Sequence, residues 1–104
     1  MGYPERLAGL LVLSLALGGG ATVAFAYAGQ ELAKDATVSL QDARITALRA
    51  VPGQITDEEL EKEGGGSGLR YSFDIKLRGA THEVGVDAKT GKVLENSLEG
   101  PNPD

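Results

Sequence analysis

The feature that most constrains the fold is the strict alternation of apolar and polar side chains in residues 69–78, LRYSFDIKLR. Side chains on a β-strand point alternately to opposite faces of the sheet, so this segment is predicted to be a strand with one apolar and one polar face. A second alternating run follows at residues 82–87 after Gly79 and Ala80. The DAKTG sequence at residues 87–91 supplies a turn. The pattern predicts an antiparallel meander with one buried face.

A helix that can cover this face is predicted between Ser39 and Pro52. Ser39 and Asp42 resemble a capping box, and Pro52 with Gly53 ends the helix. Apolar residues recur at helical spacing at Leu40, Ala43, Ala47, Leu48 and Val51. The predicted fold class is α+β, with one N-terminal helix packed on a small antiparallel sheet of three to four strands. The expected core is Leu40, Ala47, Leu48, Val51, Tyr71, Phe73, Ile75, Val84, Val86 and Val93.

Residues 54–63, QITDEELEKE, fit two different structures. Thr56 and Glu59 can cap a second helix, and Glu, Leu and Lys are good helix formers. The same segment can instead be a bent edge strand, whose charges discourage edge-to-edge pairing. Local propensity favours the helix, and the GGGSG sequence at residues 64–68 is predicted to be a flexible connection.

Residues 1–28 have the layout of a secretory signal peptide, because a charged start precedes an uncharged apolar run. The small-x-small pattern places the cleavage region at Ala24, Ala26 and Ala28. The alternative is an uncleaved membrane anchor, since the run up to Ala28 is roughly long enough to span a bilayer. Three glycines at residues 18–20 favour the signal peptide. Residues 29–37 are then expected to be a linker, residues 38–98 a folded domain and residues 99–104 a flexible tail.

The composition of the 104-residue chain narrows its functional class. A formal net charge of -5 argues against a nucleic-acid partner, because no basic surface displaces counterions. The absence of cysteine excludes disulfides, thiolate metal sites and a cysteine nucleophile. His82 is the single histidine and makes a poor metal site on its own. The acidic run at residues 57–63 fits a solvated strand edge better than a weak cation site. No enzyme, cofactor or metal site is predicted.

Four segments together resemble the PepSY family, which occurs in propeptides of certain secreted metallopeptidases and in small exported proteins. They are VSLQDARITALRAVPG, ITDEELEKEGG, LRYSFDIKL and HEVGVDAKTGKVLE, and they cover nearly all of residues 38–95. The hairpin DAKTGKVL after an alternating strand is the most specific part. The resemblance implies one helix on an antiparallel sheet and makes residues 54–63 a strand. Thr46, where relatives often have an aliphatic residue, and the long GGGSG loop depart from the family pattern.

The resemblance implies a non-catalytic, periplasmic or secreted interaction module that binds or inhibits an extracytoplasmic peptidase. The candidate binding face consists of Arg70, Lys76 and Arg78, which can dock against an acidic cleft, while the sheet edge can pair by strand addition. A solvated sheet face is the simpler interpretation of these residues. The alternative function is a small-ligand or cation-binding envelope protein, which carboxylates converging in a pocket would favour. A membrane contact is expected only through the N-terminal segment.

Overall fold

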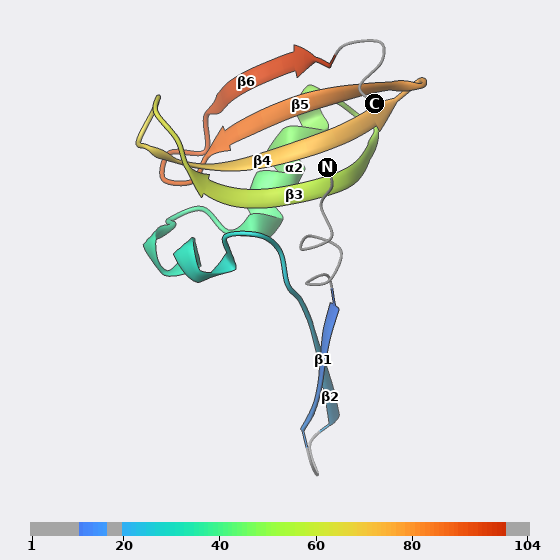
Figure 1. The fold of residues 1–104 in the computed structure, drawn as a ribbon, viewed down its shortest axis with the longest axis vertical. Coiled ribbons are helices and arrows are strands. Elements are labelled where there is room, and N and C mark those ends of the chain that lie inside the picture. The colour runs from blue at the N-terminus through green and yellow to red at the C-terminus, as the bar shows by residue number, and fades with distance from the viewer. Residues whose placement is uncertain (1–10, 17–19, 100–104) are drawn as a thin grey trace.

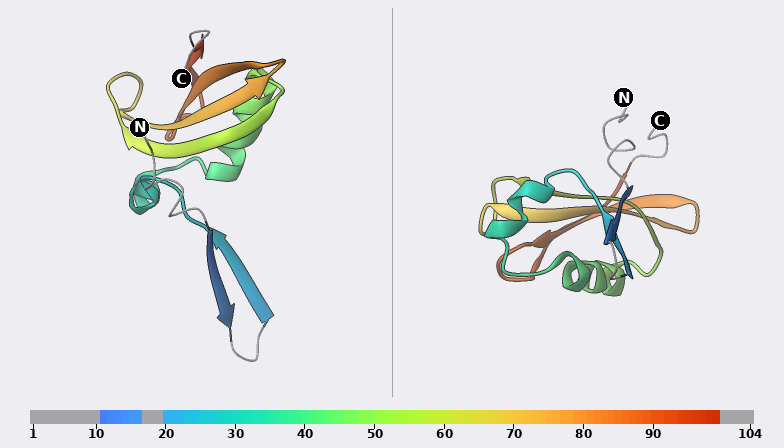
Figure 2. Two further views of the ribbon diagram at one scale, coloured as in Figure 1. Left: turned by 45° about the vertical axis from the view of Figure 1, so that its right-hand side comes forward. Right: turned by 90° about the horizontal axis from the view of Figure 1, so that it is seen from below.

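The computed structural model describes residues 11–16 and 20–99, with side chains from residue 26 onward. Its main unit is one α-helix packed on a four-stranded antiparallel sheet (Figure 1). The helix lies on one side of the sheet when the molecule is seen from below (Figure 2). The elements are α2 (Leu40–Ala50), β3 (Gln54–Lys62), β4 (Leu69–Leu77), β5 (Ala80–Asp87) and β6 (Val93–Leu98), with the strands in the order β3-β4-β5-β6. This architecture confirms the predicted α+β class.

Among the described residues, three further elements precede α2. Strands β1 (Leu11–Ala16) and β2 (Gly20–Phe25) form a separate two-stranded antiparallel sheet, and the 3-10 helix η1 spans Gln30–Asp35. In the described part of the chain, no helix is long and apolar enough to cross a membrane. Residues 1–10 and 17–19 of the predicted signal peptide, including two of its three glycines, and residues 100–104 of the predicted tail lie outside the described residues.

Helix α2 begins and ends where its flanking residues dictate. The Asp42 backbone N–H donates to Ser39 Oγ at 3.0 Å, which satisfies one of the unpaired N–H groups of the first turn. After Ala50 the backbone becomes extended at Val51, the residue before Pro52, as expected for that position. Ala43 and Ala47 are fully buried against the sheet, and their small side chains allow α2 to approach it closely.

Strand β3 shows that pairing overrides local helix propensity in this segment. It pairs antiparallel with β4, with an irregularity between Ile55 and Asp57. Leu60 is only 2% exposed, and Ile55 packs against the core. The strand gains both backbone pairing and apolar burial, which an isolated charged helix would lack. The strand that the family resemblance implied is confirmed.

The core lies between α2 and the central strands. The expected core residues that are buried are Ala47, Val51, Tyr71, Phe73, Ile75, Val84 and Val86. Leu40 and Leu48 are partly buried and pack against them. Val93 is 43% exposed and is not a core residue, which corrects the expectation. It lies on the edge strand β6, whereas α2 packs mainly over β4 and β5.

Residues 29–37, expected to be a linker, contain η1 and are packed against the edge of β3. The Leu60 N–H donates to the Ala28 carbonyl at 2.9 Å. Tyr27 and Leu32 pack against the core. Gly29 has φ 85, and a Cβ there would lie 1.7 Å from the Leu60 carbonyl oxygen. This close approach explains why glycine is needed where the segment runs beside β3.

We expect Gly29→Ala to lower the free energy of unfolding by about 2–3 kcal/mol. A left-handed φ costs a residue with a Cβ roughly 1–2 kcal/mol, and the contact with Leu60 also forces the segment away from β3. Gly79→Ala is the matched control, because Gly79 has φ 81 but a Cβ added there would meet no atom within 4 Å. Urea unfolding of both variants separates the two effects. Equal losses would show that the approach to Leu60 contributes nothing.

Candidate functional site

The three basic residues of the candidate binding face do not form one surface. Lys76 and Arg78 are exposed near the β4–β5 turn, but Arg70 is only 7% exposed. Arg70 and Lys76 lie on one strand at positions roughly 20 Å apart. The expectation of an exposed Arg70 on a shared basic face is therefore wrong.

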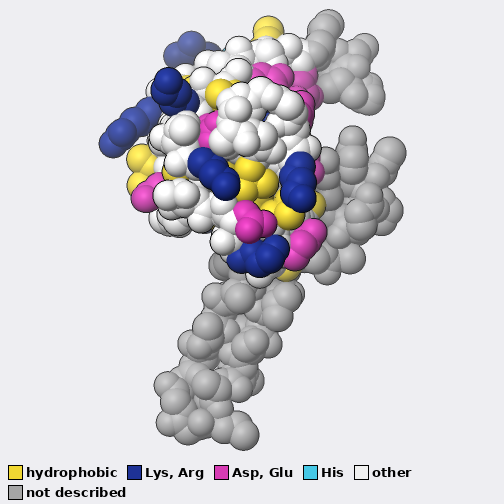
Figure 3. Space-filling view, turned by 90° about the vertical axis from the view of Figure 1, so that its left-hand side faces the viewer, with side chains coloured by type: hydrophobic (Ala, Val, Ile, Leu, Met, Phe, Trp, Pro, Cys, Tyr) yellow, Lys and Arg dark blue, Asp and Glu magenta, His cyan; other side chains and the backbone are white. Residues whose placement is uncertain are grey.

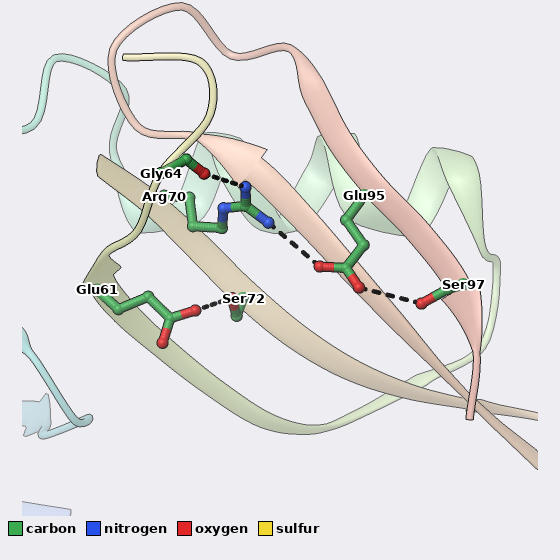
Figure 4. Close-up of polar contacts among 6 residues, drawn as sticks. All are labelled: Glu61, Gly64, Arg70, Ser72, Glu95 and Ser97. Carbon is green, nitrogen blue, oxygen red and sulfur yellow. Dashed lines mark hydrogen bonds and ion pairs between the residues drawn. The ribbon is translucent and has the colours of Figure 1, made fainter. Parts of the chain in front are cut away.

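Arg70 is buried because it lies flat across the neighbouring strand. Its Nη1 donates to Glu95 Oε1 at 3.2 Å, and its Nη2 donates to the Gly64 carbonyl at 3.1 Å (Figure 4). A Cβ at Gly85 would lie 3.1 Å from Nη1 and 3.2 Å from Cδ of Arg70. The missing side chain of Gly85 thus lets an arginine on β4 reach across β5 to a glutamate on β6.

The acidic run at residues 57–63 is divided between the two faces of β3. Glu58 faces α2, where its carboxylate accepts from Arg44 Nε at 2.8 Å and from Arg44 Nη2 at 2.5 Å. Glu61 lies on the opposite face and accepts from Ser72 Oγ at 2.7 Å (Figure 4). The run therefore does not converge on one site, in keeping with the alternation of side chains along a strand.

The helix-free face of the sheet instead gathers carboxylates from other strands. Carboxylate oxygens of Asp74, Glu83 and Glu99 all lie within 4.8 Å of one another, and the three residues are partly buried. Asp74 on β4 is directly opposite Glu83 on β5. The Glu99 N–H donates to the Thr81 carbonyl at 2.8 Å, which extends the β6 pairing to Glu99. We call Asp74, Glu83 and Glu99 the carboxylate cluster.

Sequence reasoning missed the carboxylate cluster, although part of its signal was present. Alternation places Asp74 and Glu83 on the polar faces of their strands, and the tight turn at Arg78 and Gly79 sets them opposite each other. The position of Glu99 depends on how far β6 pairs with β5, which the local pattern does not fix.

The pKa of Glu83 is raised from 4.5 to about 7 in these surroundings. Partial burial is the largest cause, followed by the negative charges of Glu95, Asp74, Glu99 and Glu61. A carboxyl in such surroundings resists ionisation until its charge is compensated. The helix-free face thus brings several carboxylates close together near β5 and β6.

Glu83→Gln is expected to stabilise the domain at pH 8 and to have little effect at pH 5. The folded pKa is raised from 4.5 to about 7, so the stability linked to Glu83 is present below pH 4.5 and is lost as the pH rises through 7. The gain at pH 8 is about 1 kcal/mol, because solvent screens a partly exposed group. Urea midpoints at both pH values test this, with the exposed Glu31→Gln as control. A gain of equal size at pH 5 would contradict it.

Asp87 organises the loops at the opposite end of β5. It is 1% exposed and accepts hydrogen bonds from Ser67 N at 2.7 Å, Ser67 Oγ at 2.8 Å, Lys89 N at 2.8 Å and Thr90 N at 3.0 Å. Burial alone would raise the pKa of Asp87, but these hydrogen bonds hold it well below the usual range. The GGGSG loop, expected to be a flexible connection, is tied to β5 through Ser67. The role of Asp87 is structural.

The surface at this end of the molecule is mixed in charge. Figure 3 shows Lys and Arg side chains around a few exposed apolar groups, with Asp and Glu side chains between several of them. Lys89 and Lys92, in the turn between β5 and β6, are exposed. Because the charges here are mixed, the loops do not form an alternative to the predicted basic binding face.

The fold and these sites define a small α+β module in which Asp87 and Arg70 tie loops to the sheet. The chain belongs to the PepSY family, because the family model described as "Peptidase propeptide and YPEB domain" matches residues 37–96, more than half of the chain. PepSY domains are generally propeptide or inhibitor-like modules without catalytic activity, and they are typically extracellular or periplasmic. No curated protein and no solved structure matches the chain significantly.

Proposed function

We propose that this chain is a non-catalytic extracytoplasmic module that binds and restrains a secreted or periplasmic peptidase. The observation that carries the proposal is the family match, which runs from just before α2 into β6 and so covers the helix-and-sheet unit. The chain also has no cysteine and one histidine, His82, which lies half-buried opposite Ile75. These residues support a binding role better than nucleophilic or metal-dependent catalysis.

Affinity capture with the folded chain from an envelope extract of the source organism tests this function. We expect a peptidase to be recovered in stoichiometric amount and its activity to fall as the module is added. Heat-unfolded protein on the same matrix is the control for nonspecific adsorption. If the proteins captured by the folded chain include no peptidase, the proposal is wrong.

Export through a cleaved signal peptide belongs to the same proposal. Of the candidate residues Ala24, Ala26 and Ala28, cleavage after Ala26 is favoured because it keeps Tyr27 and Ala28 in the mature chain. Tyr27 packs against the core, and the Ala28 carbonyl accepts the hydrogen bond from Leu60. The intact mass of exported protein is expected to correspond to a chain beginning at Tyr27. A mass that includes the full N-terminal segment would favour the membrane anchor.

The carboxylate cluster favours a second candidate function, a cation-binding envelope protein. Oxygen ligands of Asp74, Glu83 and Glu99 converge rather than spread along an edge, as a hard cation requires. Titration with calcium would then raise the melting temperature, and Glu83→Gln would remove the increase. A calcium response together with a capture that lacks peptidase would favour this function over the first.

A further inference from the structure

Strand β6 is the open edge of the sheet. Among the residues that the structure describes, β6 pairs with β5 alone, whereas β3 at the other edge is bridged by Ala28. Glu99 N donates to the Thr81 carbonyl, and the bonding direction alternates along an antiparallel strand. The N–H and C=O groups of Asn96 and Leu98 therefore point away from β5. Such an edge is a template for an added strand.

Two exposed apolar side chains flank this edge. Val93 is 43% exposed and Leu98 is 62% exposed, and they lie near the two ends of β6. Their partners across β5 are Val86 and His82, on the face that α2 covers. Both side chains thus lie on the helix side of the sheet, beyond the cover of α2. A strand added at this edge would bury part of this apolar surface.

The charge beside the edge indicates which kind of strand fits. The carboxylate cluster and Glu95 lie on the helix-free face of β4, β5 and β6. A second copy paired through β6 would continue the same sheet and bring two such acidic faces side by side, in chains of formal net charge -5. Like charges on neighbouring strands oppose pairing. A basic segment would instead compensate the carboxylates.

The side chains of β6 leave room for this compensation. Glu99 lies on the continuation of β6 itself, and Ser97 is directly opposite Glu83, so only a small side chain lies between the open edge and Glu83. Backbones two strands apart are roughly 10 Å from each other, a span that a lysine or arginine and a glutamate can bridge together. Arg70 already makes this reach within the sheet, since it passes over Gly85 to contact Glu95.

On the basis of the proposed function, we propose that β6 is the docking edge for an extended basic segment of the partner protein. The segment adds as a fifth strand and bonds the outward backbone groups of Asn96 and Leu98. Lys or Arg residues beside Glu95 and Ser97 reach the carboxylate cluster, and the apolar residues between them contact Val93 and Leu98.

The test uses a nine-residue peptide of alternating Lys and Val, added to the isotope-labelled chain and followed by NMR. We expect backbone amide shifts concentrated in residues 93–99 and an affinity at least tenfold lower in 0.5 M salt than in 50 mM salt. The same peptide with Glu for Lys is expected not to bind. A peptide with Pro for alternate Val keeps the charge but cannot pair along the edge, so it should bind at least tenfold more weakly.

Protein variants separate edge pairing from charge. Asn96→Pro removes an outward N–H, and edge strands tolerate proline where the N–H faces solvent. It is expected to weaken binding at least tenfold. The double variant Glu83→Gln with Glu99→Gln is expected to weaken it several-fold, while Glu31→Gln on η1 leaves it unchanged. If Asn96→Pro fails to fold, the proline peptide still tests the pairing.

Several results would contradict the proposal that β6 is a docking edge. These are shifts centred near Lys76, equal binding of the Glu peptide, no binding, or a dimer formed through β6 without peptide. The two proposals fail separately. A peptidase captured equally well by the Asn96→Pro chain would overturn the docking edge and leave the peptidase-binding function standing. Peptide binding at β6, together with a capture that recovers no peptidase, would overturn the peptidase-binding function and leave the docking edge standing.

Discussion

Replacing Phe73 by alanine is expected to lower the free energy of unfolding by about 3–5 kcal/mol. Phe73 is 0% exposed at the centre of β4, directly opposite Val84 on β5. Its ring lies 6.4 Å from that of Tyr71, in a stacked arrangement. The sheet is held by pairing on both sides of β4, so the walls of the resulting cavity have little freedom to collapse. Urea unfolding monitored by circular dichroism measures the loss.

The control lies on the same strand. Lys76 is exposed on the helix-free face, and Lys76→Ala is expected to change stability by less than about 0.5 kcal/mol. A domain of this size has a total stability of only about 5–15 kcal/mol, so Phe73→Ala should remove a large part of it. A loss below roughly 1 kcal/mol would mean that the core closes around the deletion and that Phe73 does not anchor it.

The residue pattern predicts the layers of this fold because burial imposes the period. The alternation around Phe73 and the helical spacing around Ala47 each place one apolar face, and the two faces meet in the core. The pattern was insufficient for β3, where Glu, Leu and Lys favour a helix locally. Only pairing with β4 makes the strand stable there, and the family resemblance carried that information.

The details of the candidate site depend on neighbours distant in sequence. Alternation gives the face on which Arg70 begins but not the gap over Gly85 that lets it lie flat. The exposure of Val93 depends on how much of the sheet a short helix covers. The carboxylate cluster needs the register of the β4–β5 hairpin and the length of β6. None of these quantities is set by a local run of residues.

The loops show the same limit. Glycines in the GGGSG sequence predict flexibility, since glycine tolerates many backbone conformations. In the structure, Gly66 has φ 56, and a Cβ there would lie 2.3 Å from Asp87 Oδ2. The glycine-rich loop is thus folded around a carboxylate twenty residues further along the chain. The glycines permit this close approach, but the loop sequence alone does not show that the group approached is Asp87.

Asp87→Ala is expected to lower the free energy of unfolding by about 3–5 kcal/mol, because it removes the buried, charged acceptor of four hydrogen bonds. Two of these donors belong to Ser67, and the backbone N–H groups of Lys89 and Thr90 are the others. Both the glycine-rich loop and the β5–β6 turn lose their common acceptor. Asp87→Asn, of the same size, should lose somewhat less, because its amide oxygen still accepts.

The pH dependence of the stability tests whether the negative charge of Asp87 is the cause of this stabilisation. The folded pKa of Asp87 is lowered from 3.8, so its contribution is fully present above about pH 4 and is lost as the pH falls toward the folded pKa. The stability difference between the original chain and Asp87→Asn should therefore be constant from pH 5 to 8 and shrink below pH 4. Asp35→Asn on the exposed η1 should change stability by less than about 0.5 kcal/mol at any pH. A difference that persists undiminished at pH 2 would show that shape, not the carboxylate charge, holds the two loops.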